Sequence, residues 1–413
     1  MRLTRAAAAA VVLGALLFPT SPAAAAPAAE QCAEPGTAIT QVPWAQERQA
    51  PERIWPVADG SGTRVAVLAS GVDAGHPQLT GRVREGENYL PGETSGADTD
   101  CEGGGTQVAG VIAAAPVQGV GFSGLAPGAA VVPYRVATST VVENGESPES
   151  GTPATLAEAV RDATAARPDV LVVPVVTYVD DAELKAAVAA AVAADIVVIA
   201  AVGDARPSGD GPALPYPAAY DGVVGVVGVN QDGALIGDGS AWPAVDLAGP
   251  GDGLVSTQIG GGLVEVAGSA IAAGYVAGTA ALIRSRWPDA KAADVVRRLL
   301  ATATPSAATT GNGIVNPAQA VTATMTTASP AALDAGPGEA PSAQSDDRGS
   351  TIALVAAAVL AVAAVLGVTF AVAIPRGRKR RWRPGLAPRP AEYPEDDAPA
   401  PPRMLFEDWT PRH

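Results

Sequence analysis

Histidine and cysteine are scarce in this chain of 413 residues. Each occurs twice, as His76 and His413 and as Cys32 and Cys101. Protein metal sites are built from clustered His, Cys, Asp or Glu at recognisable spacings, so the sequence predicts no metal centre. No other cofactor is expected. A hydrolytic centre would also have few candidates for its base, which must lie within hydrogen-bonding distance of a nucleophile.

Basic residues are outnumbered as well. The chain has 27 Lys and Arg against 42 Asp and Glu, which leaves a formal net charge of -15. Nucleic acids and anionic lipid surfaces are bound mainly through basic side chains. The acidic balance therefore excludes nucleic acid as a partner of the main body of the chain.

Charged residues make up only 17% of the chain against 48% hydrophobic residues, and the apolar excess lies in two segments. The first is an apolar run over 6–18 that follows a charged start and ends in small residues. This pattern is typical of a secretory signal peptide, predicted here over 1–26, with a buried helix as the alternative. The second run is uncharged and long enough to cross a bilayer, which takes about 20 residues, so it predicts a transmembrane helix over 351–374.

A basic cluster at 376–383 follows the predicted span directly. Positive charge beside a span stays in the cytoplasm, so we expect a single-pass cell-membrane protein with an extracellular N-terminal domain. The tail, 375–413, is then basic, Pro-rich and cytoplasmic. Nucleic-acid binding is the other interpretation of such a cluster.

The remainder divides by composition into an N-terminal arm over 27–52, a domain over 53–322 and a Pro/Ala/Ser-rich tether over 323–350. The arm has no periodic apolar face and is expected to be extended. In the domain, apolar runs alternate with helical patterns, which predicts an α/β fold with a mostly parallel sheet flanked by helices. The expected strands are 64–68, 131–136, 170–176, 196–202 and 223–229, and the expected helices 105–115, 156–166, 181–194 and 292–303.

Both cysteines fall in the part predicted to be exported, where disulfides form and persist. Pairing Cys32 with Cys101 is the only intramolecular option, and two free thiols are the alternative. Such a bond would close a loop of about 70 residues and constrain the unfolded chain by roughly 4 kcal/mol on the chain-entropy model.

The segment 268–288 begins with Gly268, Ser269 and Ala270 and continues as a long run of small residues that ends at Trp287 and Pro288. It resembles the nucleophile segment of subtilisin-like serine proteases, in which a Gly-Thr-Ser turn opens a buried helix. Ala270 stands where the family has its serine. A methyl group cannot attack a carbonyl, so the body of the motif survives without its reactive atom.

Two further segments carry the same resemblance. The strand that holds the family's aspartate matches 65–72, and there the chain has Ala69. The family's Gly-His-Gly-Thr-x-Val-Ala-Gly signature matches 103–110, and there the imidazole position is Gly104. The resemblance therefore implies that all members of a Ser-His-Asp triad are missing.

The oxyanion-hole asparagine of the family corresponds to Asp204, an anion that cannot donate a hydrogen bond to a developing negative charge. Pro174 lies in the strand that would pair with an extended substrate, and it has no N–H to offer. The sequence is thus identified as a subtilisin-fold pseudoprotease. The fold that the resemblance implies is the three-layer subtilisin-like α/β fold.

The order of segments narrows the resemblance further. A signal peptide, a cysteine-bearing arm, a subtilisin-like domain, a tether, one C-terminal span and a short basic tail resemble the mycosins, membrane-anchored proteases associated with type VII secretion. A second cysteine pair often found in mycosins is absent. The resemblance implies attachment to a type VII secretion membrane complex as a scaffold or assembly component.

Two alternatives stay open. A serine endopeptidase with a rewired site would draw on Ser269, Asp73 and His76, although His76 is expected on a surface turn and Ser269 is expected to cap its helix. A peptide-binding module would keep the old cleft as a groove, with Asp204 favouring a cationic group. Pro174 argues against strand-like capture of a peptide there.

Overall fold

The computed structural model describes residues 32–140, 151–205, 214–237, 244–306 and 311–325. All of them belong to the first of two compact units of the chain, Met1–Thr326. The predicted signal peptide, transmembrane helix and tail, and all of the tether beyond 325, lie outside the described residues. Within the described ranges, no helix is long and apolar enough to cross a membrane.

A seven-stranded parallel sheet forms the middle layer, in the order β2-β3-β1-β4-β5-β6-β7. Its strands are rich in valine and alanine and, apart from the two-residue β2, are mostly buried, as expected for a parallel sheet covered on both sides. The mostly parallel α/β architecture predicted from the sequence is confirmed. The strands are β1 (Arg64–Ala69), β2 (Glu87–Asn88), β3 (Ala130–Arg135), β4 (Val170–Val173), β5 (Val197–Ala201), β6 (Val223–Val229) and β7 (Leu247–Pro250).

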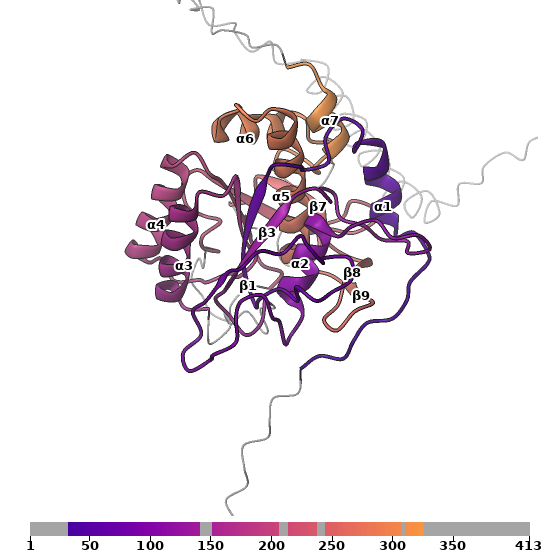
Figure 1. Ribbon diagram of the computed structural model, residues 1–413. Coiled ribbons are helices and arrows are strands. Elements are labelled where there is room, and N and C mark those ends of the chain that lie inside the picture. The colour runs from indigo at the N-terminus through magenta and orange to yellow at the C-terminus, as the bar shows by residue number, and fades with distance from the viewer. Residues whose placement is uncertain (1–31, 141–150, 206–213, 238–243, 307–310, 326–413) are drawn as a thin grey trace, which may run out of the picture. The chain divides into compact units, whose positions relative to one another are not determined.

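Helices cover the two faces of this sheet (Figure 1). Alternate residues of β1 divide between them: Val65 and Val67 pack into one core and Leu68 into the other. The first core holds α2 (Gly104–Ala113), α5 (Ser269–Arg286), α6 (Ala292–Ala301) and α7 (Pro317–Thr322), and the second holds α3 (Pro153–Ala166) and α4 (Ala182–Ala193).

The central helix α5 lies beside α2 because glycines let the two backbones approach. A Cβ on Gly274 would lie 3.4 Å from the carbonyl oxygen of Val108, and a Cβ on Gly278 would lie 3.6 Å from the Cα of Ile112. Both contacts advance by one helical turn, so the two helices run in the same direction. Their N-terminal ends therefore lie next to each other.

Two local expectations are wrong. Strand β4 ends at Val173 rather than 176, since Pro174 cannot donate to the ladder. The arm is not wholly extended: it contains the helix α1 (Trp44–Gln49) and leads into a 3-10 turn, η1 (Pro51–Arg53). Helix α1 is held by tertiary contacts that its sequence pattern does not predict. For example, the Gln46 side chain donates hydrogen bonds to Ser123.

A small antiparallel sheet of β8 (Leu254–Thr257) and β9 (Leu263–Val266) adjoins α2. The Ser256 and Thr257 hydroxyls donate to carbonyls in the first turn of α2. The arm joins this sheet through the bridge between Thr37 and Leu263. These contacts hold the N-terminal end of α2 in place.

Candidate functional site

The four positions singled out by sequence lie where strands end and helices begin. Ala69 ends β1 and Gly104 begins α2. Asp204 follows β5, and Ala270 lies in the first turn of α5. Carboxyl ends of parallel strands meet at one edge of a sheet, which is the usual place for a site in an α/β fold.

Contacts bring these positions together. The Cβ of Ala69 lies 3.0 Å from the place where a Cβ on Gly105 would be. The carboxylate of Asp204 accepts hydrogen bonds from the backbone N–H and the hydroxyl of Ser269, at 2.9 and 2.6 Å. The register of α2 and α5 sets Gly104 and Ala270 at adjacent helix ends. Ala69 thus lies beside the first turn of α2, and Asp204 beside the first turn of α5.

The space beside Gly104 is already filled. A Cβ on Gly104 would lie 2.0 Å from the Thr140 Oγ1 and 2.6 Å from the Glu102 Oε2. Cβ contacts this short do not occur, so no larger residue fits at 104 unless Thr140 and Glu102 move. The sequence did not predict that Thr140 and Glu102 would lie beside Gly104. No motif could indicate Thr140, because it belongs to a loop that is distant in sequence.

Asp100 caps helix α2. Its carboxylate accepts from the backbone N–H groups of Glu102, Gly103 and Thr106 and from the Thr106 hydroxyl, at 2.7–3.2 Å. A helix N-terminus carries unpaired N–H groups and a partial positive charge. The carboxylate satisfies several of these donors at once.

Asp204 does the same for α5. The residue before the helix is Gly268, with φ 121°, and it offers no side chain for capping. Ser269 is the first helical residue and donates its hydroxyl to Asp204, so the expectation that Ser269 itself is the cap is wrong. One oxygen of the Asp204 carboxylate, Oδ1, therefore accepts both hydrogen bonds at the start of α5.

We expect Asp204→Ala to lower the free energy of unfolding by about 1–2 kcal/mol, because loss of a helix cap costs about that much. The matched control is Asp232→Ala in an exposed turn, which leaves helix ends untouched. The measurement is the urea-unfolding midpoint of both variants. Equal midpoints for the two would show that Asp204 does not cap α5.

Glu102 is a half-buried carboxyl beside Asp100. Burial raises the pKa of Glu102, the charge of Asp100 adds to the rise, and the hydrogen bonds from the Gly104 N–H and the Ser139 hydroxyl counteract it. The folded protein therefore holds this proton more tightly than the unfolded chain does. Its contribution to stability falls as pH rises from 4.5, the unfolded value, through the folded pKa.

Glu102→Gln is accordingly expected to be more stable than the parent at neutral pH, since glutamine keeps an acceptor for Gly104 and carries no charge. The advantage should shrink below pH 4.5, where the glutamate of the unfolded chain is also protonated. Urea midpoints at neutral pH and below pH 4.5 test this, with Glu265→Gln, at the exposed position of β9, as control. An advantage that does not change with pH would contradict it.

His76 was expected on a surface turn, but the structure buries it. It is 2% exposed, and both ring nitrogens are engaged: Nε2 lies 2.9 Å from the Gly262 carbonyl oxygen and Nδ1 accepts from the Gln78 N–H. Since Nδ1 accepts from Gln78, Nε2 is the ring nitrogen that can donate to Gly262. Asp73 accepts from Gly75 and Gly260. The His76 backbone N–H donates to the Asp73 carbonyl oxygen at 3.2 Å, but within the described residues no side-chain hydrogen bond joins His76 to Asp73 or Ser269.

The cysteines pair as the sequence predicts. Cys32 and Cys101 form a disulfide with a Cα–Cα distance of 4.5 Å, and the Ala33 N–H donates to the Cys101 carbonyl oxygen. The arm is thus fastened to the loop that carries Asp100 and Glu102. Across the described ranges, no cluster of three or more His, Cys, Asp or Glu could hold a metal ion.

Comparison with known proteins identifies relatives of this architecture. The model of the subtilase family matches residues 60–331. Mycosin-4 of Mycobacterium tuberculosis is 32% identical, and the match covers 86% of each chain.

Solved structures of related proteins are also similar to this chain. The serine protease MycP1, described as an essential component of the type VII (ESX-1) secretion system, is 28% identical with a TM-score of 0.58, over 70% of this chain and 92% of its own. A chain of an intact ESX-5 inner membrane complex is 26% identical with a TM-score of 0.63, over 82% of this chain and 94% of its own.

Proposed function

The chain belongs to the subtilase family, and from this premise we propose that it is a pseudoprotease of the mycosin type that acts as a scaffold or assembly component of a type VII secretion membrane complex. In this proposal the domain is extracytoplasmic and the segment 351–374 anchors it in the membrane. Ala69, Gly104 and Ala270 stand at the triad positions, and Asp204 stands at the oxyanion position.

The filled space beside Gly104 carries the pseudoprotease proposal. A lone substitution of a catalytic residue leaves an empty place that a water or a neighbouring group can use. Here Thr140 Oγ1 and Glu102 Oε2 lie 2.0 and 2.6 Å from the position that a Cβ would take, so these side chains occupy the place where a larger residue at 104 would begin. Asp204 adds a second obstacle, because its negative charge opposes an oxyanion at the start of α5.

The contacts of Ser269 and His76, the nucleophile and base that a rewired hydrolase would need, do not support that alternative. Both ring nitrogens of the buried His76 are engaged, by Gly262 and Gln78. The Ser269 hydroxyl donates to Asp204, so its proton is directed at a carboxylate rather than at an imidazole. A general base has to contact its nucleophile, and this pair does not meet that requirement among the described residues.

The cleft-binding alternative is also weakened by the contacts. Asp204 is the charged group that would select a cationic ligand, and its carboxylate already accepts two hydrogen bonds from Ser269. Pro174 follows β4 directly and is buried, so it offers no N–H to an added strand. The outer faces of the domain are the better candidates for partner contact.

The scaffold role rests on the relatives. MycP1 is described as an essential component of its secretion system, and the ESX-5 match is a chain within an inner membrane complex. An inactive chain with this fold can supply contacts to such a complex without supplying cleavage.

The test is affinity purification of the full chain from its own cell envelope after crosslinking, with partners identified by mass spectrometry, alongside deletion of the gene. We expect recovery of type VII membrane components, and loss of complex integrity and secretion on deletion. Complementation with a chain that carries Asp204→Ala should restore both, because no chemistry is required. An intact complex with unaltered secretion in the deletion strain would refute the scaffold role.

A further inference from the structure

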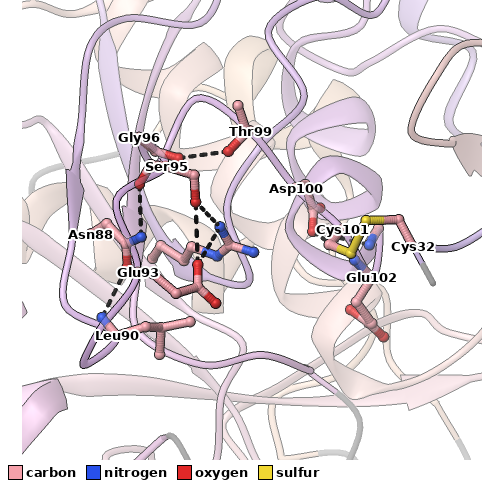
Figure 2. A network of polar contacts seen from close by, with 12 residues as sticks. Cys32, Asn88, Leu90, Glu93, Ser95, Gly96, Thr99, Asp100, Cys101 and Glu102 are labelled. Carbon is pink, nitrogen blue, oxygen red and sulfur yellow. Dashed lines mark hydrogen bonds and ion pairs between the residues drawn. A yellow bond between two sulfur atoms is a disulfide. The ribbon is translucent and has the colours of Figure 1, made fainter. Parts of the chain in front are cut away.

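An open groove of about 620 Å³ runs along helix α6, which lies on the outside of the domain (Figure 1). Its lining includes Val192 near the end of α4 and Ile196 just before β5, and we name it the α6 groove. Because Ile196 precedes β5 and Asp204 follows it, the groove lies at the opposite edge of the sheet from the triad positions. It shares no residue with the polar network around Asp100 and the disulfide (Figure 2).

Helix α6 carries two apolar faces. One is buried in the domain core through Ala292, Val295 and Leu299. The other lines the groove and consists of Ala293, Val296, Arg297, Leu300 and Ala301. The spacing of this second set, i, i+3, i+4, i+7 and i+8, is that of a face which a helix presents to a neighbouring element. Its members are partly or fully exposed in the described part of the chain, so the fold leaves this face open.

The margin of the groove is positively charged, although the chain as a whole is acidic. The segment 284–298 has five basic side chains and only two acidic ones. The Arg297 side chain is 59% exposed, and its ion pair with Asp294 at 2.7 Å is a surface pair, which contributes little. The Lys291 side chain is 75% exposed and lies 3.8 Å from Asp195. Asp195 already accepts the first backbone N–H of α6 at 2.8 Å, so the margin favours an acidic partner.

We propose that the α6 groove docks an acidic amphipathic helix of a type VII membrane component, an inference that rests on the scaffold role proposed above. The apolar side chains of such a helix pack against Val296 and Leu300, as ridges of one helix fit grooves of another. Its acidic side chains pair with Lys291 and Arg297. These two cations are six positions apart, about 9 Å along a helix axis, which suits acids on successive turns of a partner helix. A lipid carboxylate could pair with only one of them.

The test is photo-crosslinking of the full chain in its own cells, with p-benzoylphenylalanine in place of the exposed Ala301 of the groove. The control position is Val179, which is 57% exposed and lies outside the groove. We expect a crosslink from position 301, and none from 179, to an acidic helical segment of a type VII membrane component, identified by mass spectrometry of the joined peptides. A crosslink to lipid alone, to a second copy of this chain, to any other segment or to nothing would overturn the proposal.

Two charge variants locate the contact. Ala293→Glu puts a negative side chain into the groove and should fold normally, since an acid in the first turn of a helix is favourable. Arg297→Glu reverses the charge of the margin at an exposed position. Each should lower the crosslink yield about tenfold, because like charges that face each other across an interface repel. Arg84→Glu, at an exposed arginine outside the groove, is the matched control and should keep the yield of the parent.

Thermal unfolding of the purified variants checks that they fold. Unchanged yield in both groove variants would overturn the assignment. The outcome is distinguishable from a failure of the scaffold role: a deletion strain that loses its complex, together with groove variants that crosslink and complement like the parent, would refute this docking surface and leave the scaffold role standing.

Discussion

A chain that carries Ala69→Asp, Gly104→His, Ala270→Ser and Asp204→Asn together is expected to stay inactive toward peptide substrates. The four substitutions supply the residue types of the family's reactive groups, but a histidine at 104 would begin where two neighbouring side chains already lie. Thr140 Oγ1 and Glu102 Oε2 lie 2.0 and 2.6 Å from the place of the new Cβ. The histidine must therefore displace its neighbours or distort the start of α2, and a misplaced base contributes little.

Adding Thr140→Gly and Glu102→Ala to these four substitutions gives the matched comparison. The two changes remove both side chains that approach the Cβ position of residue 104. A positioned general base contributes roughly 10²–10⁴-fold, so the six-substitution chain should cleave a chromogenic peptide faster by about that factor. Thermal unfolding should show that both variants fold. Equal activity of the two would mean that Thr140 and Glu102 do not obstruct the site.

Removing the disulfide should have the largest effect on stability. Cys32 and Cys101 are 69 residues apart, so the chain-entropy model gives a loss of roughly 4 kcal/mol in Cys32→Ser, Cys101→Ser. The double variant is preferred because a single one leaves a reactive thiol. Urea unfolding of the parent with and without a reducing agent, compared with the double variant, measures this loss.

The double variant also serves as its own control, because reductant should leave it unaffected while shifting the parent to the same midpoint. We further expect trypsin to cut the arm sooner at Arg48 or Arg53 once the bond is gone, since the arm loses its fastening to the loop of Asp100. Parent and variant with equal midpoints under oxidising conditions would show that the other contacts of the arm suffice.

Most of the fold could be predicted because its strands are apolar runs of ordinary length between turn signals. Strand β1 and helix α3 lie where the patterns put them. Strand β4 was predicted too long, because the apolar run continues beyond Pro174. The hydrophobic pattern does not show that proline lacks the N–H needed for strand pairing. Helix α1 was missed because it is short and is held by contacts such as Gln46 with Ser123 rather than by its own periodicity.

The packing around the candidate site could not be predicted from the sequence. Motif spacing singled out Ala69, Gly104, Ala270 and Asp204, and the structure places them at or near the ends of β1, α2, α5 and β5. No pattern could indicate that Thr140 would fill the space beside Gly104, since the two are distant in sequence and meet only in the folded chain. His76 was expected on the surface because the corresponding turn of the subtilisin-like family is a surface feature, and the Gly262 carbonyl that contacts its ring belongs to the loop between β8 and β9.

The aspartates at the starts of α2 and α5 have a consequence for chemical labelling. Fluorophosphonate reagents that tag active serine hydrolases need a nucleophile and a vacant pocket of N–H groups for the phosphoryl oxygen. In this chain Asp100 and Asp204 hold such groups at both helix ends. Proteome-wide labelling with these reagents should therefore overlook the protein however abundant it is, and its presence in a cell has to be counted by peptide mass spectrometry or an antibody.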